Sequence, residues 1–416
     1  MLGPGILFAS TAIGVSHLVQ STRAGAGFGF ALLWAVFAAN LFKYPFFEYG
    51  SRYANSTGES IIDGYKRIGI WMLWLYFILT IGSMFFIVAA VGFVTAGFCD
   101  NLFGLSALVP GFKLFPVLLV FVICTGILLA GKFKALDGII KIIGLVLLCS
   151  TLLAFTLTLA HGPIPKVDTF IKPEVWSNAG ILFIIALMGW MPTALDLSSW
   201  NSLWTLERIK QTGYHPTMKE TLFDFNFGYW AAAILSVCFV TMGAFLIYGS
   251  GVDMPSSSAL FANKVVELYT ATIGQWSYLI IAAAAFSIMV GTTLGVFDGY
   301  ARSLERTAEL LFLSDEKAKM ALNDRKVYII SLLVCAVGGF AIIAFFMNHF
   351  KALIDLATTI SFLIAPLIAI VNFKLVSNKY IKEEHVPPMW MQILSYAGIL
   401  FLSGFSLFYI YVKLIR

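Results

Sequence analysis

The feature that most constrains this chain is a series of apolar runs, each about as long as a lipid bilayer is thick. A helix needs about 20 consecutive apolar residues to cross the ~30 Å hydrocarbon core of a membrane. Because lipid offers no hydrogen-bond partners, a spanning segment must be a helix or part of a closed barrel. The sequence lacks the alternating segments of about 10 residues that are typical of barrel strands. We therefore expect an all-α membrane protein.

The composition supports a lipid-facing surface. Only 12% of the residues are charged and 60% are hydrophobic, whereas a soluble domain has about 25% charged residues. We predict about eleven transmembrane helices, the first and sixth of them broken. The predicted spans cover residues 4–24, 28–49, 70–98, 114–129, 137–159, a sixth that starts near 175, 225–248, 276–300 with a helical extension to 312, 327–346, 353–375 and 389–411.

The loops between the spans predict the orientation of the protein. Cytoplasmic loops of membrane proteins are enriched in Lys and Arg. If the N-terminus is cytoplasmic, most of the 27 Lys and Arg residues lie on the cytoplasmic side. We therefore predict an integral protein of the bacterial inner membrane, with its N-terminus inside and its C-terminus outside. No loop is long enough for a separate domain, so we expect residues 1–416 to form one transmembrane domain.

Several classes of protein are excluded by charge and by missing motifs. The net charge of +5 is scattered over loops, which does not favour binding to nucleic acid. The sequence contains no HExxH, GxSxG or phosphate-loop motif, so we expect neither an enzyme nor a resident cofactor. The expected partners are membrane lipid and a small ion or small molecule that is transported.

Two predicted spans are interrupted in their middle, and they stand five spans apart. The first is interrupted at Gly14–His17, and the sixth at Gly189–Thr193, where Pro192 removes a helical hydrogen bond. Paired interruptions are typical of a midplane binding site in an inverted-repeat transporter. A kinked but continuous helix is the alternative. We predict one repeat at about 1–160, a second at about 174–376 and an extra span at about 389–411.

Short segments of the chain match one known family. They are Gly3-Pro4-Gly5-Ile6-Leu7, Arg23-Ala24-Gly25-Ala26-Gly27-Phe28-Gly29, Leu33-Trp34, Ala39-Asn40-Leu41, Ser56-Thr57-Gly58-Glu59-Ser60 and Met191-Pro192. With these segments the chain resembles the Nramp divalent-metal transporters, which have the wider LeuT-like fold. The resemblance implies a secondary-active transporter that binds a metal ion between spans one and six and alternates between two open states.

The residues that hold the metal in that family are replaced here. The family has Asp-Pro-Gly-Asn in its first span, and the aligned residues are Gly14–His17, so the carboxylate is absent. A hard dication prefers oxygen ligands that include a carboxylate, whereas His17 and Met191 suit a softer ion. The substrate site implied by the resemblance consists of Gly14, Val15, Ser16, His17, Met188, Met191, Thr193, Asp196 and Thr358, with His17 and Met191 as metal ligands.

Most of these residues also have a purely structural interpretation. His17 can bond to a neighbouring helix as a neutral imidazole, Asp196 can cap amides freed at the break, and Met188 and Met191 can simply fill the core. Lys43 lies in the second span and is expected to pair with Glu48 or with an acid on another span.

Span eight contains the predicted ion-coupling residues. Thr292, Thr293 and Asp298 occupy it, and adjacent hydroxyls in this span bind Na⁺ in sodium-coupled members of the wider fold that the chain resembles. Span hydroxyls also bond back to their own helix, and Asp298 with Arg302 forms an ordinary i,i+4 pair.

Three functions remain open from the sequence. The first is transport of a metal cation, which the family resemblance implies. The second is symport of a small organic or anionic solute with protons or sodium, which the missing carboxylate favours. The third is a membrane sensor that keeps the fold without transport.

Overall fold

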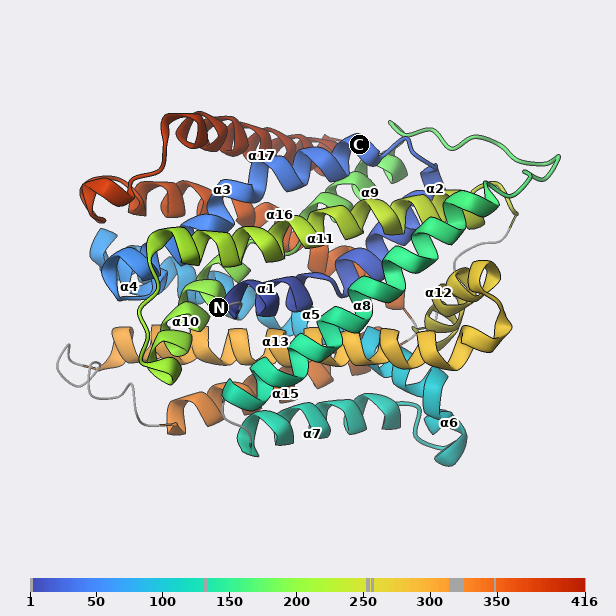
Figure 1. Ribbon diagram of the computed structural model, residues 1–416, viewed down its shortest axis with the longest axis horizontal. Coiled ribbons are helices and arrows are strands. Elements are labelled where there is room, and N and C mark those ends of the chain that lie inside the picture. The colour runs from blue at the N-terminus through green and yellow to red at the C-terminus, as the bar shows by residue number, and fades with distance from the viewer. Residues whose placement is uncertain are drawn as a thin grey trace.

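The computed structural model describes residues 3–130, 133–251, 255, 258–313, 325–347 and 349–415. Within these ranges the chain forms helices and connecting loops and no strand. The long helices lie nearly parallel to one another along the long axis of the molecule (Figure 1). The short helix α4 (Ile61–Ile68) lies at one end, and α6 (Leu105–Leu108) and α12 (Ser258–Ile273) lie at the other. We call these the α4 end and the α12 end.

The predicted all-α membrane fold with about eleven spans is confirmed. Seven of the described helices are long and apolar enough to cross a membrane, and two shorter helices are also apolar. The spans are α1, η1 and α2 (Pro4–Ala12, Ser16–Ser21, Thr22–Phe28), α3 (Leu33–Thr57), α5 (Ile70–Phe103), α7 (Phe115–Ala130), α8 (Phe133–His161), α9 and α10 (Asn178–Gly189, Leu197–Thr212), α11 (Met218–Leu246), α13 (Tyr278–Phe312), α15 (Lys326–Phe346), α16 (Phe350–Leu375) and α17 (Met389–Ile415).

Local sequence signals account for several helix ends. Pro4 starts α1, where its missing amide is not needed. Capping boxes formed by Ser60 with Asp63 and by Thr217 with Glu220 start α4 and α11.

The second span begins and ends later than predicted, and the short helices α4, α6 and α12 were not predicted. These three helices lie in connections and have 8, 4 and 16 residues, so a search for apolar runs as long as a membrane span does not find them.

The spans pack into two groups that meet around the first span. Spans one, two, six and seven contact one another through α1, α2, α3, α10 and α11. Spans three, four, eight and nine do the same through α5, α7, α13 and α15. The helix α1 packs against both α11 and α13, so the first span lies between the groups. Helices α8 and α16 contact members of both groups. This arrangement places the break in span one at the interface of the two groups.

Both predicted interruptions are present in the structure. In span one, α1 ends at Ala12, and the chain resumes at Ser16–Ser21 as a π-helix. Such segments are rare and occur mostly as single turns at functional sites. In span six, α9 ends at Gly189 and α10 starts at Leu197, so seven residues between them are not helical. The Met191–Pro192 peptide bond in this stretch is cis. Span one therefore changes its winding, whereas span six is fully interrupted.

Candidate functional site

A small cavity lies where the two interrupted spans meet. Its volume is about 20 Å³, which is enough for about one water molecule. Val15 and Ser16 of span one and Trp190, Thr193 and Leu197 of span six contribute to its wall. The rest of the wall comes from Thr11, Ala12, Ile87, Val91, Ala194, Trp200, Thr292 and Val296. The cavity is therefore small, enclosed by both groups of spans and mostly apolar.

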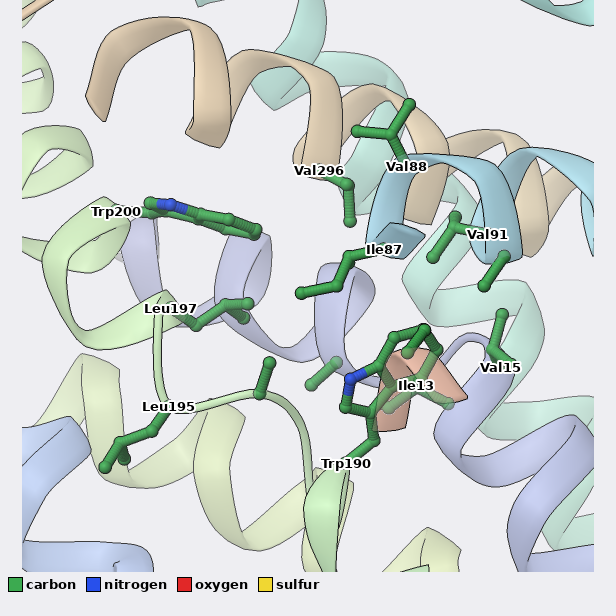
Figure 2. Packing of buried hydrophobic residues seen from close by; sticks show 14 of the residues in the cluster. Ile13, Val15, Ile87, Val88, Val91, Trp190, Leu195, Leu197, Trp200 and Val296 are labelled. Atoms are coloured by element: carbon green, nitrogen blue, oxygen red, sulfur yellow. The ribbon is translucent and has the colours of Figure 1, made fainter. Parts of the chain in front are cut away.

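Figure 2 shows how side chains from four spans converge on this point. Trp190 and Trp200 of span six lie on two sides of it, and Ile87 of α5 points between them. The polar side-chain groups of the lining residues are the hydroxyls of Thr11, Ser16, Thr193 and Thr292 and the indole N–H groups of the two tryptophans. No carboxylate, imidazole or thioether is among the side chains of its wall. The cavity can thus offer hydroxyl oxygens, aromatic faces and aliphatic groups to a bound species.

Two residues of the first interruption have contacts that fix their positions. A Cβ atom on Gly14 would lie 2.5 Å from the Thr292 side chain, so only glycine allows span one to approach α13 this closely. The His17 ring faces α11: its Nε2 lies 2.8 Å from the Ala232 carbonyl and its Nδ1 lies 2.6 Å from the Ser16 hydroxyl. Because a carbonyl can only accept, Nε2 donates. Both nitrogens of His17 are thus engaged, and a metal ion would have to displace one of these bonds.

The methionines of span six are buried but do not line the cavity. Met188 and Met191 are fully inaccessible to solvent, and neither belongs to the cavity wall. Their neighbourhood contains a different chemical group. The Lys43 ammonium, from span two, donates to the carbonyls of Met188, Gly189 and Thr193 over 2.6, 2.8 and 3.3 Å. In the described residues, no group of three or more His, Cys, Asp and Glu side chains is placed to hold a metal ion.

Of the two pairings expected for Lys43, the one with Glu48 is wrong, whereas an acid of another span, Asp196, lies near enough to attract the Lys43 ammonium. Glu48 forms its ion pair with Arg52, one turn further along α3. That pair is local, whereas Lys43 faces span six across the bundle. The helical spacing of five residues between Lys43 and Glu48 places them on different faces of α3, which explains the difference.

Asp196 and Thr358 lie near the break without lining the cavity. The Asp196 carboxylate accepts a hydrogen bond of 2.9 Å from the Tyr300 hydroxyl, and its side chain does not cap α10. The Thr358 hydroxyl donates to the Ile354 carbonyl of its own helix and accepts from Gln20 of span one. Thr358 therefore links span ten to span one on the α12 side of the break.

The predicted ion-coupling residues have separate surroundings. The Thr292 hydroxyl donates to the Ser10 carbonyl of span one over 2.9 Å, so it connects α13 to the end of α1. The Thr293 hydroxyl bonds back to Met289 and lies 2.7 Å from the Thr95 hydroxyl of α5. Asp298 accepts from Trp204 Nε1, Arg302 Nε and Tyr328 Oη, from three different spans, over 2.8 to 2.9 Å. Only Thr292 of the three reaches the cavity.

Replacing Asp298 with alanine should destabilise the protein by about 3 kcal/mol, because it removes the acceptor of two buried donors, Trp204 Nε1 and Tyr328 Oη, and one partner of the half-buried Arg302 guanidinium. Thermal unfolding of the purified protein in detergent measures this effect. Asp168→Ala, in an exposed loop, is the control and should change little. If Asp298→Ala kept its unfolding temperature and lost only ion-dependent transport, a role in ion coupling would be supported instead.

Two polar contacts join span one to its neighbours on opposite sides of the break. Toward the α4 end, the Asp224 carboxylate of α11 accepts from the backbone amides of Gly3 and Gly5, each over 2.8 Å. We call this contact the Asp224 latch. Toward the α12 end, the Arg23 guanidinium of α2 forms a bidentate pair with the Asp355 carboxylate of α16, over 2.7 and 3.1 Å. We call this pair the Arg23 latch.

The Arg23 latch joins three spans. Arg23 also donates to Gln20 and lies 5.0 Å above the Phe183 ring of α9. Outside the latch, an open cavity of about 590 Å³ is lined by Arg23 and Asp355 together with residues of α9 and α17. The structure therefore has a wide opening at the α12 end and a narrow cavity beneath it, and the latch separates the two.

Sequence reasoning found three hydroxyls of the cavity, those of Ser16, Thr193 and Thr292, but missed other residues of the site. Lys43 was expected to pair with an acid and not with carbonyls of span six, and Asp224 and Trp200 were not predicted to belong to the site. A signal existed for Lys43, because a charged residue inside an apolar span is a functional candidate by default. No sequence signal pairs Asp224 with the start of α1, since the two are separated by more than 200 residues.

Comparison with known proteins identifies the family. The family model for natural resistance-associated macrophage protein-like (Nramp) proteins matches residues 5–412. This chain belongs to the Nramp family. A protein of Pasteurella multocida described as uncharacterized is 34% identical over 413 residues, which cover 98% of this chain and 91% of the relative. The chain is accordingly an integral membrane protein and a secondary-active transporter, not an enzyme.

Solved structures support the same fold. A manganese transporter of Eremococcus coleocola aligns with a TM-score of 0.73 at 14% identity, over 98% of this chain and 85% of that one. Mhp1, a transporter of the nucleobase-cation-symport-1 family, aligns with a TM-score of 0.60 at 13% identity, over 99% and 93% of the two chains. These similarities show that this Nramp protein shares its fold with both transporters.

Proposed function

We propose that this Nramp protein carries a small cation across the bacterial inner membrane by alternating access around the cavity between spans one and six. The observation that supports this most directly is the water-sized cavity at the meeting point of two interrupted spans, with a latch toward each end. Such an arrangement suits an occluded intermediate, from which opening one latch at a time would expose the cavity to one side only.

A metal cation is the substrate class we favour. A cavity of about 20 Å³ fits a single ion much better than an organic molecule. The similar Eremococcus protein is described as a manganese transporter. In this chain the ligands would be hydroxyl oxygens of Ser16, Thr193 and Thr292 together with backbone carbonyls of lining residues near the breaks, such as Val15. Without a carboxylate we expect such a site to hold a hard dication more weakly than a site that has one.

A small organic solute is the second candidate. The indoles of Trp190 and Trp200 and the aliphatic side chains around them favour it. Mhp1, which shares the fold, was solved with bromovinylhydantoin bound, and MhsT, with a TM-score of 0.59, was solved with L-phenylalanine. For such a solute the cavity would have to widen, and coupling to protons or sodium would supply the driving force.

The topology is also part of the proposal. We place the α4 end in the cytoplasm, because the loops at that end carry most of the Lys and Arg residues. The N-terminus would then lie inside and the C-terminus outside. The two breaks, five spans apart, support two repeats at about 1–160 and 174–376 with an extra span at about 389–411.

The Thr193→Val variant tests the site. Valine has nearly the same shape but no oxygen, so we expect the apparent affinity for the transported cation to fall by about tenfold. Uptake into proteoliposomes with Mn²⁺, Zn²⁺, Cu²⁺ and Mg²⁺ measures this, beside a panel of small organic solutes. Thr241→Val is the matched control, because the Thr241 hydroxyl bonds only within α11, at Val237.

The outcomes separate the candidate functions. Metal uptake that weakens in Thr193→Val and not in Thr241→Val supports the first candidate. Uptake of an organic solute, with no metal uptake, supports the second. Saturable binding of any of these compounds without uptake would contradict transport and support a sensor.

A further inference from the structure

A lysine lies in the middle of the membrane-spanning bundle, and the proposed transport cycle does not use it. Lys43 is in α3, and its side chain is fully buried. A charged side chain at this depth is costly unless it is paired. The described contacts of its ammonium are to backbone carbonyls of span six, not to a carboxylate.

The three carbonyls form a cage for one cation. An ammonium has three N–H donors, and the carbonyls of Met188, Gly189 and Thr193 accept them at 2.6, 2.8 and 3.3 Å. Met188 and Gly189 end α9, where the last carbonyls of a helix have no amide partners and the helix dipole is negative. Thr193 lies within the break. The ammonium therefore links the end of α9 to the non-helical stretch that follows it.

The charge of the ammonium is matched by its surroundings. Asp196, at the far side of the break, attracts Lys43 through space. The other acid of α3 near it, Glu48, is already paired with Arg52. The break thus contains what a bound monovalent cation needs: oxygen ligands, the negative end of a helix and a nearby carboxylate. In this chain a side chain supplies the cation.

We propose that Lys43 is a tethered cation that fills a carbonyl cage in span six, so that the break closes around the cavity without a free cation bound in the cage. Lys43 is thus a positioning residue: it acts on substrate through the shape of residues Trp190–Asp196. The role of Lys43 in transport rests on the proposed alternating access. The test of the filled cage does not, because it measures only the stability of the protein. A species of the same chemistry, a primary alkylammonium, should replace the side chain when the side chain is removed.

The Lys43→Ala variant with n-propylammonium tests this replacement. Alanine keeps Cβ, and n-propylammonium has the three carbons and the nitrogen that are removed. In purified protein we expect Lys43→Ala to unfold at least several degrees below the wild type, and n-propylammonium chloride to restore part of this shift saturably. The neutral isostere 1-propanol, and choline chloride at the same ionic strength, should not restore it. The control Lys264→Ala, which loses only an ion pair with Glu267 on α12, should show no such rescue.

Two results would overturn the proposal. One is recovery of Lys43→Ala by 1-propanol to the same extent as by n-propylammonium, which would mean that only volume matters. The other is no recovery by either compound. If Lys43→Ala does not fold, the same measurement is made on the wild type. Na⁺, K⁺ and ammonium should then cause no saturable rise in its unfolding temperature relative to choline. A saturable rise attributable to the cage would contradict a permanently filled site. All these readouts are stabilities, so they stand even if no transported substrate is found.

Discussion

Replacing Asp224 with alanine should release the start of span one and shift the protein toward a state that is open at the α4 end. The carboxylate accepts two amide hydrogen bonds from Gly3 and Gly5 at the positive end of α1. Bonds to a charged acceptor are worth about 1.5–3 kcal/mol each. Hydrogen bonds to water replace part of this stabilisation when the latch opens. We therefore expect the free-energy difference between the closed and open states to change by about 2–3 kcal/mol. This corresponds to a shift of roughly 30- to 150-fold between closed and open states.

Close packing makes this contact specific. A Cβ atom on Gly5 would lie 1.9 Å from the Asp224 backbone carbonyl, so α1 and α11 touch through their backbones at this point. Loss of the carboxylate should therefore separate two helices that fit without space between them, and not merely remove a surface interaction.

The labelling rate of a cysteine beside the Asp224 latch measures the opening. Thr205 is buried in α10 and lines a second cavity, of about 50 Å³, whose wall also includes Asp224. Its hydroxyl donates to the Asn201 carbonyl of its own helix. Thr205→Cys should react with a soluble thiol reagent at least about tenfold faster when combined with Asp224→Ala. Asp224→Asn keeps one carbonyl oxygen, so the labelling rate in this background should lie between the rates with Asp224 and with Asp224→Ala. Equal labelling in all three backgrounds would show that Asp224 does not control opening.

Removing Asp355 should open the opposite end of the bundle. The Arg23–Asp355 pair joins spans one and ten, with Gln20 bonded to both partners. The Asp355 side chain is 39% exposed and that of Arg23 is 13% exposed, so solvent screening reduces the strength of the pair to about 1 kcal/mol. We expect Asp355→Ala to increase the open population by about fivefold.

Thr358→Cys reports on the Arg23 latch, because Thr358 is buried beneath it and bonded to Gln20. Its labelling by a membrane-impermeant thiol reagent should be about fivefold faster in Asp355→Ala, and Arg23→Gln should have the same effect. The double variant should add little, because both changes remove one interaction. Glu267→Ala breaks an ion pair on α12 and should leave the rate unchanged. Additive effects of Arg23→Gln and Asp355→Ala would contradict a shared latch.

The two latches and Lys43 act at different places on spans one and six. The latches fix the outer parts of span one to spans seven and ten. Lys43 fixes the centre of span six to span two. Their effects should therefore be separable: latch variants change access to the cavity, whereas Lys43 variants change the shape of the break.

The sequence by itself determined the spans and the places where two of them break. Apolar runs about as long as the membrane is thick must become helices, because lipid leaves no other partner for the backbone. Pro192 and the flanking glycine weaken the helix wherever the rest of the chain lies. The ion pairs of Glu48 with Arg52 and of Asp298 with Arg302 are equally local, since they follow from helical spacing of four residues.

Only the tertiary structure decided which groups face the cavity. The His17 ring faces α11 because the Ala232 carbonyl of that helix is close enough to accept a hydrogen bond from Nε2. Lys43 reaches span six because α3 packs against the end of α9. The amides at the start of α1 find Asp224 on a helix more than 200 residues away. Such contacts depend on how helices pack in three dimensions, and no periodicity within one helix encodes its neighbour.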